Sequence, residues 1–266
     1  MEEYLYHYTS VETLEKILEN QTFRFSSLLT VDDMEESKTK DFGDYGRFCY
    51  VSCWTSKREE TSSLWSEYTN KKGVRIRLPR NIFPTVLDFP NIPKGNPNIL
   101  IEGQSDLKFE YTKGLTNIER NRGMTFMPRI TELFPVTYTE DNFLLNLSVT
   151  SENSIDQTLI GRFKHKSVWE HQNEWRYKLF GLPFSIDEFY HLHVTNQFES
   201  VIQSLSKDNN LSCEYFDLPV DEEKFNDMEI VLSSLLSENE KNKVKVMTDK
   251  YNPTAKIIES SIQLRK

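Results

Sequence analysis

Apolar and polar residues alternate in short runs along much of the chain, a pattern that predicts β-strands. Other stretches carry apolar residues three or four positions apart, which predicts helices. The predicted strands are 4–8, 22–26, 48–54, 74–79, 107–111, 189–194, 228–232 and 255–260, and the predicted helices are 11–20, 62–68, 154–165 and 237–248. Because strands and helices are interspersed along the sequence, we expect an α+β fold, with an antiparallel sheet flanked by helices.

The length of 266 residues suits a single domain spanning 1–266, with a C-terminal strand–helix–strand extension from about residue 225. The net charge of −9 argues against general binding to nucleic acid backbones or anionic membranes. A local basic patch at 162–166 is the exception, because it could contact a polyanion. No apolar run is long enough to span a membrane, so we expect no membrane partner.

The cysteines and the N-terminus predict a reduced, cytoplasmic protein. Cys49, Cys53 and Cys213 form no paired framework, and their spacing is not that of a zinc site. The first residues are acidic and lack the basic and apolar regions of a signal peptide. We therefore expect no structural metal.

The first predicted strand passes directly into a helix, which brings polar side chains to the helix start. His7, Thr9 and Ser10 lie at this junction, with Thr9 or Ser10 as the N-cap. The free backbone N–H groups there bind phosphates and other anions readily. The alternative for His7 is a buried, aromatic-like histidine with one satisfied nitrogen.

The run 166–179 concentrates polar and aromatic residues and holds two of the four tryptophans. Within it, Gln172 and Glu174 would share one strand face, because strand side chains alternate with period two. They would then present an amide donor and a carboxylate acceptor to the same ligand. The alternative is an ion-paired edge strand, with Glu174 and Arg176 on the shared face.

Two further sets of residues each allow two interpretations. Trp65 and Tyr68 are spaced to form an aromatic wall that could stack on a flat ring, although such pairs more often pack in a core. His191 and His193 could bind a metal, but no third ligand has a supporting spacing, which favours surface histidines.

Four stretches, taken in order, resemble a large bacterial family catalogued as domain of unknown function 2971. These stretches are Leu5–Ser10 with Leu14, Ile17 and Leu18, then Phe25–Ser26 with Asp32–Glu35, Leu64–Tyr68 with Lys72–Ile76, and Lys166 with Trp169 and Glu174–Arg176. The family usually has a proline in the second motif, where this chain has Met34, and often a glutamate at the position of Gln172. The resemblance spans roughly the first two thirds of the chain, in motif order.

The opening also resembles ADP-ribosyltransferases, several of which begin with a strand ending in His-x-Thr and carry a catalytic Glu on a later strand. This resemblance implies a split antiparallel sheet flanked by helices and NAD as the substrate. Glu174 would be catalytic with Gln172 beside it. The residues implied at NAD are His7, Tyr8, Thr9, Ser10, Tyr50, Ser52, Trp65, Tyr68 and Arg176, with the stacking aromatic chosen from Tyr50, Trp54, Trp65 and Tyr68.

The implied reaction breaks the nicotinamide–ribose bond, where a carboxylate can stabilise the oxocarbenium ion that develops. ADP-ribose would pass to a macromolecular acceptor, protein or nucleic acid, as in a toxin or an antiphage defence effector with an antitoxin or sensor partner. Two alternatives stay open. One is a non-catalytic binding or interaction module that uses the same cleft. The other is a metal-dependent nuclease or hydrolase that uses Glu170, His171 and Glu174.

Overall fold

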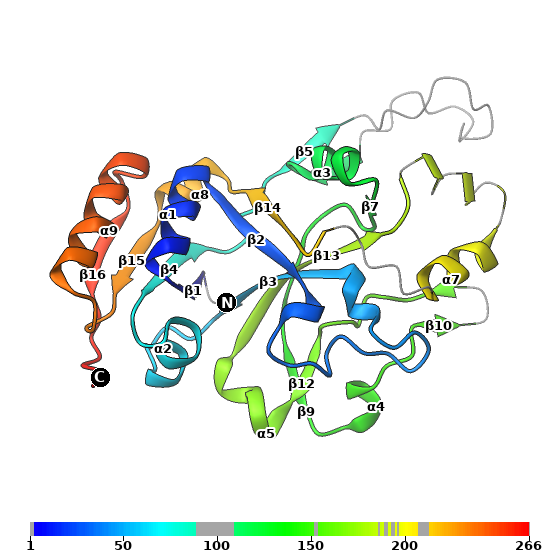
Figure 1. Cartoon of the computed structure of the whole chain (residues 1–266), viewed down its shortest axis with the longest axis horizontal. Helices are drawn as coiled ribbons and strands as arrows, with labels where there is room; N and C mark the ends of the chain where they lie inside the picture. The colour runs from blue at the N-terminus through cyan, green and yellow to red at the C-terminus, as the bar shows by residue number, and fades with distance from the viewer. Residues whose placement is uncertain are drawn as a thin grey trace.

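The computed structural model describes residues 3–88, 109–151, 154–185, 187–188, 191–192, 195, 197–206 and 213–265. It confirms a mixed α+β architecture, in which a ten-stranded sheet is flanked by helices (Figure 1). The strands of this sheet are β1 (Tyr4–Thr9), β2 (Thr22–Ser27), β3 (Cys49–Thr55), β4 (Val74–Pro79), β7 (Thr125–Phe126), β8 (Glu132–Pro135), β13 (Glu174–Leu182), β14 (Tyr215–Pro219), β15 (Glu229–Leu232) and β16 (Lys256–Glu259).

Smaller elements surround this sheet. Three two-stranded pairs are β5 (Thr85–Asp88) with β6 (Phe109–Thr112), β9 (Thr137–Thr139) with β12 (Phe163–His165), and β10 (Thr150–Ser151) with β11 (Ser154–Ile155). The helices are α1 (Val11–Asn20), α2 (Ser62–Thr69), α3 (Leu115–Arg122), α4 (Asn142–Leu145), α5 (Lys166–Trp169), α7 (Phe198–Ser206), α8 (Glu222–Asn226) and α9 (Glu238–Tyr251). Short 3-10 helices are η1 (Leu28–Thr30), η2 (Tyr45–Phe48) and η3 (Glu170–Gln172).

The sheet forks at β3. One edge of β3 pairs with β13 over its full length, from Glu174 opposite Thr55 to Phe180 opposite Cys49. The other edge is shared: β2 pairs near Tyr50, and β1 pairs only where Tyr6 lies opposite Thr55. From there β1 continues into β4, β15 and β16, whereas β2 continues into β14. The two branches therefore diverge from one central strand.

Helix α1 connects the two branches and covers the main core. Its apolar stripe of Val11, Leu14, Ile17 and Leu18 is buried, as the helical period predicts. Ser10 is the N-cap, since its side chain accepts a hydrogen bond from the Thr13 backbone N–H. Thr9, the alternative cap, is the last residue of β1.

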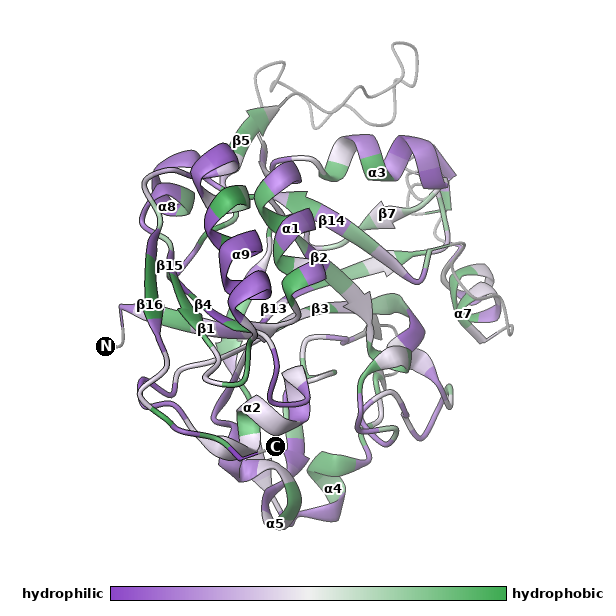
Figure 2. Cartoon of the chain, turned by 60° about the vertical axis from the view of Figure 1, so that its left-hand side comes forward, coloured by the Kyte–Doolittle hydropathy of each residue, from purple (hydrophilic) through white to green (hydrophobic). Residues whose placement is uncertain are grey.

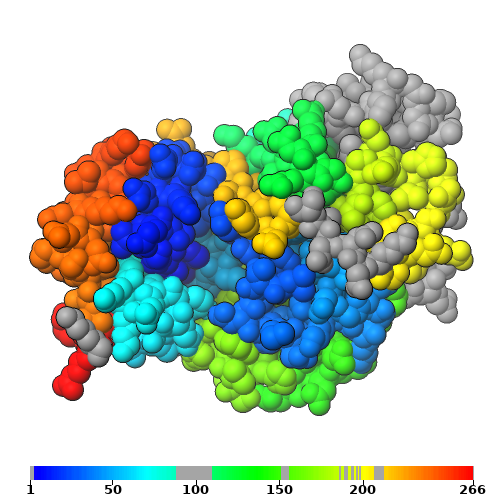
Figure 3. Space-filling view, in the orientation of Figure 1, coloured from blue at the N-terminus to red at the C-terminus, as the bar shows by residue number. Residues whose placement is uncertain are grey.

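Helix α9 lies beside α1 at one end of the molecule. Lys243 pairs with Glu15 at 2.7 Å, and the Tyr251 hydroxyl donates to Glu19. Figure 2 shows α9 as mainly hydrophilic, and Figure 3 shows the residues of α9, α1 and α2 adjoining on one face. The predicted C-terminal strand–helix–strand is thus present as β15, α9 and β16. Strand β15 pairs antiparallel with β4 but parallel with β16, because α9 connects the two strands as a crossover, so the sheet is not antiparallel throughout as predicted.

The residues after β16 return to α2. The Glu60 carboxylate, just before α2, accepts hydrogen bonds from Ser260, Ser261 and the Trp65 indole. Ile262 and Leu264 pack on a small apolar cluster formed by Tyr8, Leu64, Trp65 and Val231. Residues 260–264 therefore pack against α2. Among the described residues, no helix is long and apolar enough to cross a membrane.

Two sequence-based predictions of secondary structure are wrong. The predicted helix 154–165 is instead β11, a turn and β12, because Thr158 bonds to Asp156 in a local turn and Gly161 has a left-handed φ of 71°. In the predicted strand 189–194, the described residues His191 and Leu192 are helical, and the others lie outside the described residues. Both segments have apolar spacings that fit more than one element.

Candidate functional site

A pocket of about 80 Å³ opens where β1 leaves β3. Strands β1 and β3 contribute Tyr6, His7, Tyr8, Cys53, Trp54 and Thr55 to its lining. The other lining residues are Leu64 and Tyr68 from α2, Gln172 from η3 and Glu174 from β13. The predicted residues His7, Tyr8, Tyr68, Gln172 and Glu174, which are far apart in sequence, therefore lie around one hollow.

His7 occupies the gap between the diverging strands. Its Nδ1 lies 2.9 Å from the Cys53 carbonyl oxygen, so the imidazole replaces the backbone pairing that β1 and β3 lack there. The ring packs edge-on against Phe23 and lies 5.1 Å from the Trp54 ring. Burial lowers the pKa of His7, opposed by the bond to Cys53. A neutral ring that donates from Nδ1 keeps Nε2 as an acceptor.

Glu174 begins β13, directly opposite Thr55, and its side chain is 4% exposed. Its Oε1 accepts from Arg176 Nε at 2.6 Å, and its Oε2 accepts from Lys164 Nζ at 2.8 Å and Arg176 Nη2 at 3.1 Å. Burial raises the pKa of the Glu174 carboxyl, but the two cations outweigh this effect and lower the pKa to about 2. The carboxylate is therefore ionised at neutral pH.

Arg176 is fully buried and joins two carboxylates. Besides Glu174 it donates from Nη2 to Glu36 Oε2 at 2.8 Å and from Nη1 to the Gly161 carbonyl at 2.9 Å. Burial raises the pKa of Glu36, and its Oε1 has no partner among the described residues. The ion-paired alternative for Glu174 and Arg176 is thus present, although within the interior and not at a sheet edge.

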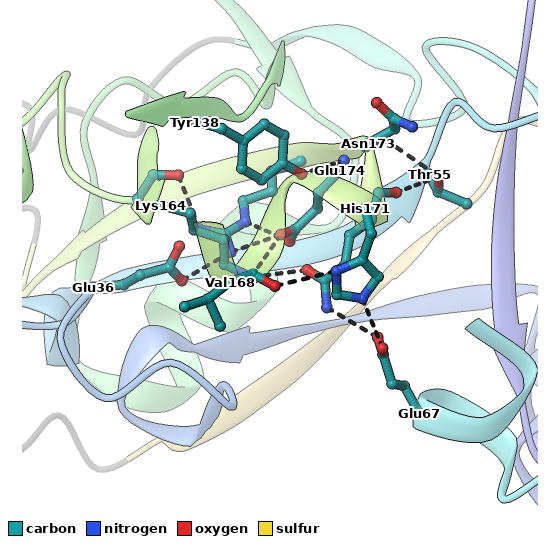
Figure 4. A network of polar contacts seen from close by, with 12 residues as sticks. Glu36, Thr55, Glu67, Tyr138, Lys164, Val168, His171, Asn173 and Glu174 are labelled. Carbon is teal, nitrogen blue, oxygen red and sulfur yellow. Dashed lines mark hydrogen bonds and ion pairs between the residues drawn. The ribbon is translucent and has the colours of Figure 1, made fainter. Parts of the chain in front are cut away.

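Gln172 does not share a strand with Glu174, so that prediction is wrong. Gln172 ends η3, and Asn173 takes a left-handed φ of 44° before β13 begins. Lys164 still bridges the two side chains, because its Nζ donates to Gln172 Oε1 at 3.2 Å and to Glu174 Oε2 at 2.8 Å. Figure 4 shows Lys164 beside Glu174. Gln172 Nε2 donates to Glu67 on α2 at 3.3 Å. His171 Nε2 also lies 2.7 Å from Glu67.

Six residues predicted at the ligand lie outside the pocket lining for identifiable reasons. Thr9 is buried at the end of β1, and Ser10 caps α1. Tyr50 is buried and donates to the Cys213 carbonyl, while Ser52 accepts from the Trp54 indole. Trp65 is fully buried and donates to Glu60. Arg176 likewise lies behind Glu174 and is not among the lining residues.

Three tyrosines and Trp54 form the aromatic part of the lining. Tyr68 on α2 is partly exposed, and Tyr6 lies under the Arg75 guanidinium at 3.9 Å. The Tyr8 hydroxyl is buried and has no hydrogen-bond partner in the described part of the chain. Of the aromatic residues considered for stacking, Tyr68 and Trp54 line the pocket. Trp65 instead packs edge-on against Tyr8.

Sequence reasoning missed several residues of this site, above all Lys164 and Glu67. Lys164 belongs to the basic stretch 162–166, which suggests a surface patch for polyanions. Its burial between β12 and β13 has no local sequence signal. Glu67 lies between Trp65 and Tyr68, and its role follows only from how α2 packs near η3.

Among the described residues, no cluster of three or more His, Cys, Asp or Glu side chains could hold a metal ion. His171 Nε2 is already paired with the Glu67 carboxylate. Glu170 is exposed and pairs with Lys166. His191 is exposed on a helical segment, and His193 lies outside the described residues. Comparisons with protein-family models, curated proteins and solved structures found no significant match.

Proposed function

We propose that this protein is an ADP-ribosyltransferase-like enzyme that cleaves NAD at this pocket and transfers ADP-ribose to a macromolecular acceptor. The observation that carries the proposal is the meeting of His7, Tyr68 and Glu174 around one hollow. These residues belong to the first strand, an internal helix and a late strand. The resemblance of the sequence to ADP-ribosyltransferases implies NAD binding, stacking and catalysis for such a set in this order.

The forked sheet supports the same proposal. A split antiparallel sheet is what the resemblance to ADP-ribosyltransferases implies, and here β1 and β2 diverge from β3. The pocket lies at the divergence of β1 and is lined by residues of both β1 and β3. A ligand bound there would contact β1, β3 and the start of β13.

The pocket volume fits part of a dinucleotide. At about 80 Å³ it lies well below the roughly 300–1,000 Å³ of typical small-molecule sites. We therefore assign to it one flat ring, the nicotinamide, between the tyrosine-rich wall and the carboxylate. The rest of NAD would extend out of the hollow, past the polar rim formed by Gln172 and Glu67.

Glu174 suits the role of an ionised acceptor. A carboxylate has about four lone-pair positions, and the two cations fill three of them with hydrogen bonds. The Cys53 thiol also hydrogen-bonds Glu174, so a ribose hydroxyl would compete with this weak donor for the remaining capacity. The developing oxocarbenium ion would face an anionic group. The cations reduce the net field of the carboxylate, so we expect hydrogen bonding to the sugar to be its larger contribution.

The test is NAD consumption by the full-length protein, measured by released nicotinamide. We expect Glu174→Gln to lower the rate by about 1,000-fold, since a positioned transition-state contact contributes several kcal/mol. Glu170→Gln is the matched control, because this carboxylate lies in the same segment but is 56% exposed. The control should stay within about twofold of wild type. If the protein neither turned over nor bound NAD at millimolar concentration, the proposal would be contradicted.

One observation favours a second candidate, the non-catalytic binding module. The carboxylate of Glu174 is held by Lys164 and Arg176, an arrangement that also suits a rigid binding site. This candidate predicts that NAD or a related ring compound binds with measurable affinity and is recovered intact. Calorimetry followed by chromatography of the ligand separates the two candidates.

A further inference from the structure

Within the described part of the chain, Lys164 is the cation that contacts both predicted active residues, Gln172 and Glu174. Its ammonium lies 2.8 Å from Glu174 Oε2 and 3.2 Å from Gln172 Oε1, and the side chain is 5% exposed. The same ammonium lies 4.6 Å from the centroid of the Trp169 ring. Because Asn173 interrupts the strand between Gln172 and Glu174, the backbone alone does not align these two side chains.

We propose that Lys164 is the positioning residue of the pocket, holding Gln172 and Glu174 so that an amide donor and a carboxylate acceptor face the same ligand. Lys164 itself is not among the lining residues, so it acts through the other two. The proposal rests on the proposed function only in naming that ligand as NAD. The arrangement of the two side chains is a separate, measurable property.

The direction of the Gln172 amide follows from Lys164. An ammonium only donates hydrogen bonds, so the amide must turn its Oε1 toward Lys164. Nε2 then faces Glu67, and one of its two hydrogens is used there. The second hydrogen is left for the pocket that Gln172 lines. Glu67 favours the same orientation, so without the ammonium the amide would keep one of the two contacts that orient it.

Two cations lower the pKa of the Glu174 carboxyl, and Lys164 is one of them. Arg176 acts from the same strand and Lys164 from β12. Titratable groups that face or influence Glu174 from other elements are Glu36, Cys53, Tyr68 and Tyr138. Removal of Lys164 leaves Arg176 as the remaining cation paired with this carboxylate among the described residues, so the pKa of Glu174 should rise.

The chain offers a close control. Lys166 lies two residues after Lys164 but is 54% exposed and pairs with Glu170 at 3.8 Å. Lys164→Met removes the buried charge while keeping much of the side-chain volume. Lys166→Met removes an exposed charge from the same segment, and Lys164→Arg restores a cation that can reach both partners.

The kinetic experiment measures kcat and KM for NAD across pH for these variants of the full chain. For Lys164→Met we expect kcat to fall about 100-fold through misplacement of the reacting groups, with a smaller change in KM. The acid limb of kcat/KM should move up by about one pH unit or more. Lys164→Arg should recover most of both effects, and Lys166→Met should resemble wild type. An unchanged kcat and acid limb in Lys164→Met would overturn the proposal.

A second measurement separates this inference from the proposed function. NMR titration of the Glu174 carboxyl carbon and the Gln172 side-chain amide requires no turnover. In Lys164→Met we expect a higher pKa for Glu174 and shifted amide signals for Gln172. If wild type does not consume NAD yet these signals change, the proposed function fails and the positioning role stands. If the signals match wild type, the positioning role is refuted whatever the activity.

Discussion

Replacement of Arg176 by methionine should be among the most destabilising single changes in this protein. The guanidinium donates four hydrogen bonds, to Glu174 (twice), Glu36 and the Gly161 carbonyl. Both carboxylates are nearly inaccessible, with Glu36 2% exposed and Glu174 4% exposed. Without Arg176, two buried carboxylates would share the single cation of Lys164. Breaking a buried ion pair in this way typically costs about 3–5 kcal/mol.

That loss is large compared with a typical domain stability of about 5–15 kcal/mol, so it is readily measured. The assay is urea unfolding at pH 7, read as the change in midpoint with an unchanged slope. Arg24→Met is the control, because Arg24 and Asp217 form a pair in which both side chains are well exposed. Such surface pairs contribute about 0–1 kcal/mol.

A double variant sharpens the test of Arg176. Adding Glu36→Gln to Arg176→Met removes one of the two uncompensated carboxylates, so it should recover part of the lost stability. If Arg176→Met lowers the unfolding free energy no more than Arg24→Met does, the buried carboxylates Glu36 and Glu174 do not depend on Arg176 for their stability. Arg176 would then not be the group that stabilises the buried Glu174 carboxylate.

Three further outcomes are expected. The pKa of Glu174 is about 2 in the folded state, compared with an ordinary value of 4.5, so its ionisation should contribute about 3 kcal/mol above pH 4.5 that is lost as pH falls toward 2. The difference in unfolding free energy between wild type and Glu174→Gln should shrink over that range, and a constant difference would refute the pKa shift. Ser10→Ala should cost about 1 kcal/mol of stability without raising KM for NAD, since Ser10 caps α1, and a tenfold rise in KM would make it a ligand contact. Tyr68→Ala should raise KM for NAD with little loss of stability, because Tyr68 is partly exposed. Trp65→Ala should lower the unfolding free energy by about 3–5 kcal/mol, because Trp65 is fully buried. Equal falls in melting temperature for the two variants would contradict this contrast.

The spacing of apolar residues predicted those elements whose burial pattern is set within a single strand or helix. The strand 4–8 and the stripe from Val11 to Leu18 follow from period-two and period-3.6 burial, and both were confirmed. The helix 154–165 failed because apolar spacing alone does not register a left-handed glycine such as Gly161. The pairing of β1, β2 and β13 around β3 depends on contacts between distant segments, which periodicity does not encode.

The same distinction applies to the site. Gln172 and Glu174 were identified from their residue types, but their shared strand face assumed an extended Asn173, a residue type that tolerates the left-handed conformation it adopts. Lys164 and Glu36 complete the charge cluster from other segments, 10 and 138 positions away from Glu174 in sequence. Only the folded chain shows that these charges are buried together.

Glu60 connects the last part of the described chain to the wall of the pocket. Its carboxylate accepts hydrogen bonds from the Trp65 indole on α2 and from Ser260 and Ser261. A shift of α2 would therefore disturb the hydrogen bonds of residues 260–264. A ligand that moves Tyr68 should therefore alter hydrogen–deuterium exchange at residues 260–264. This distant segment could report occupancy of the hollow in screens of compounds that carry no chromophore.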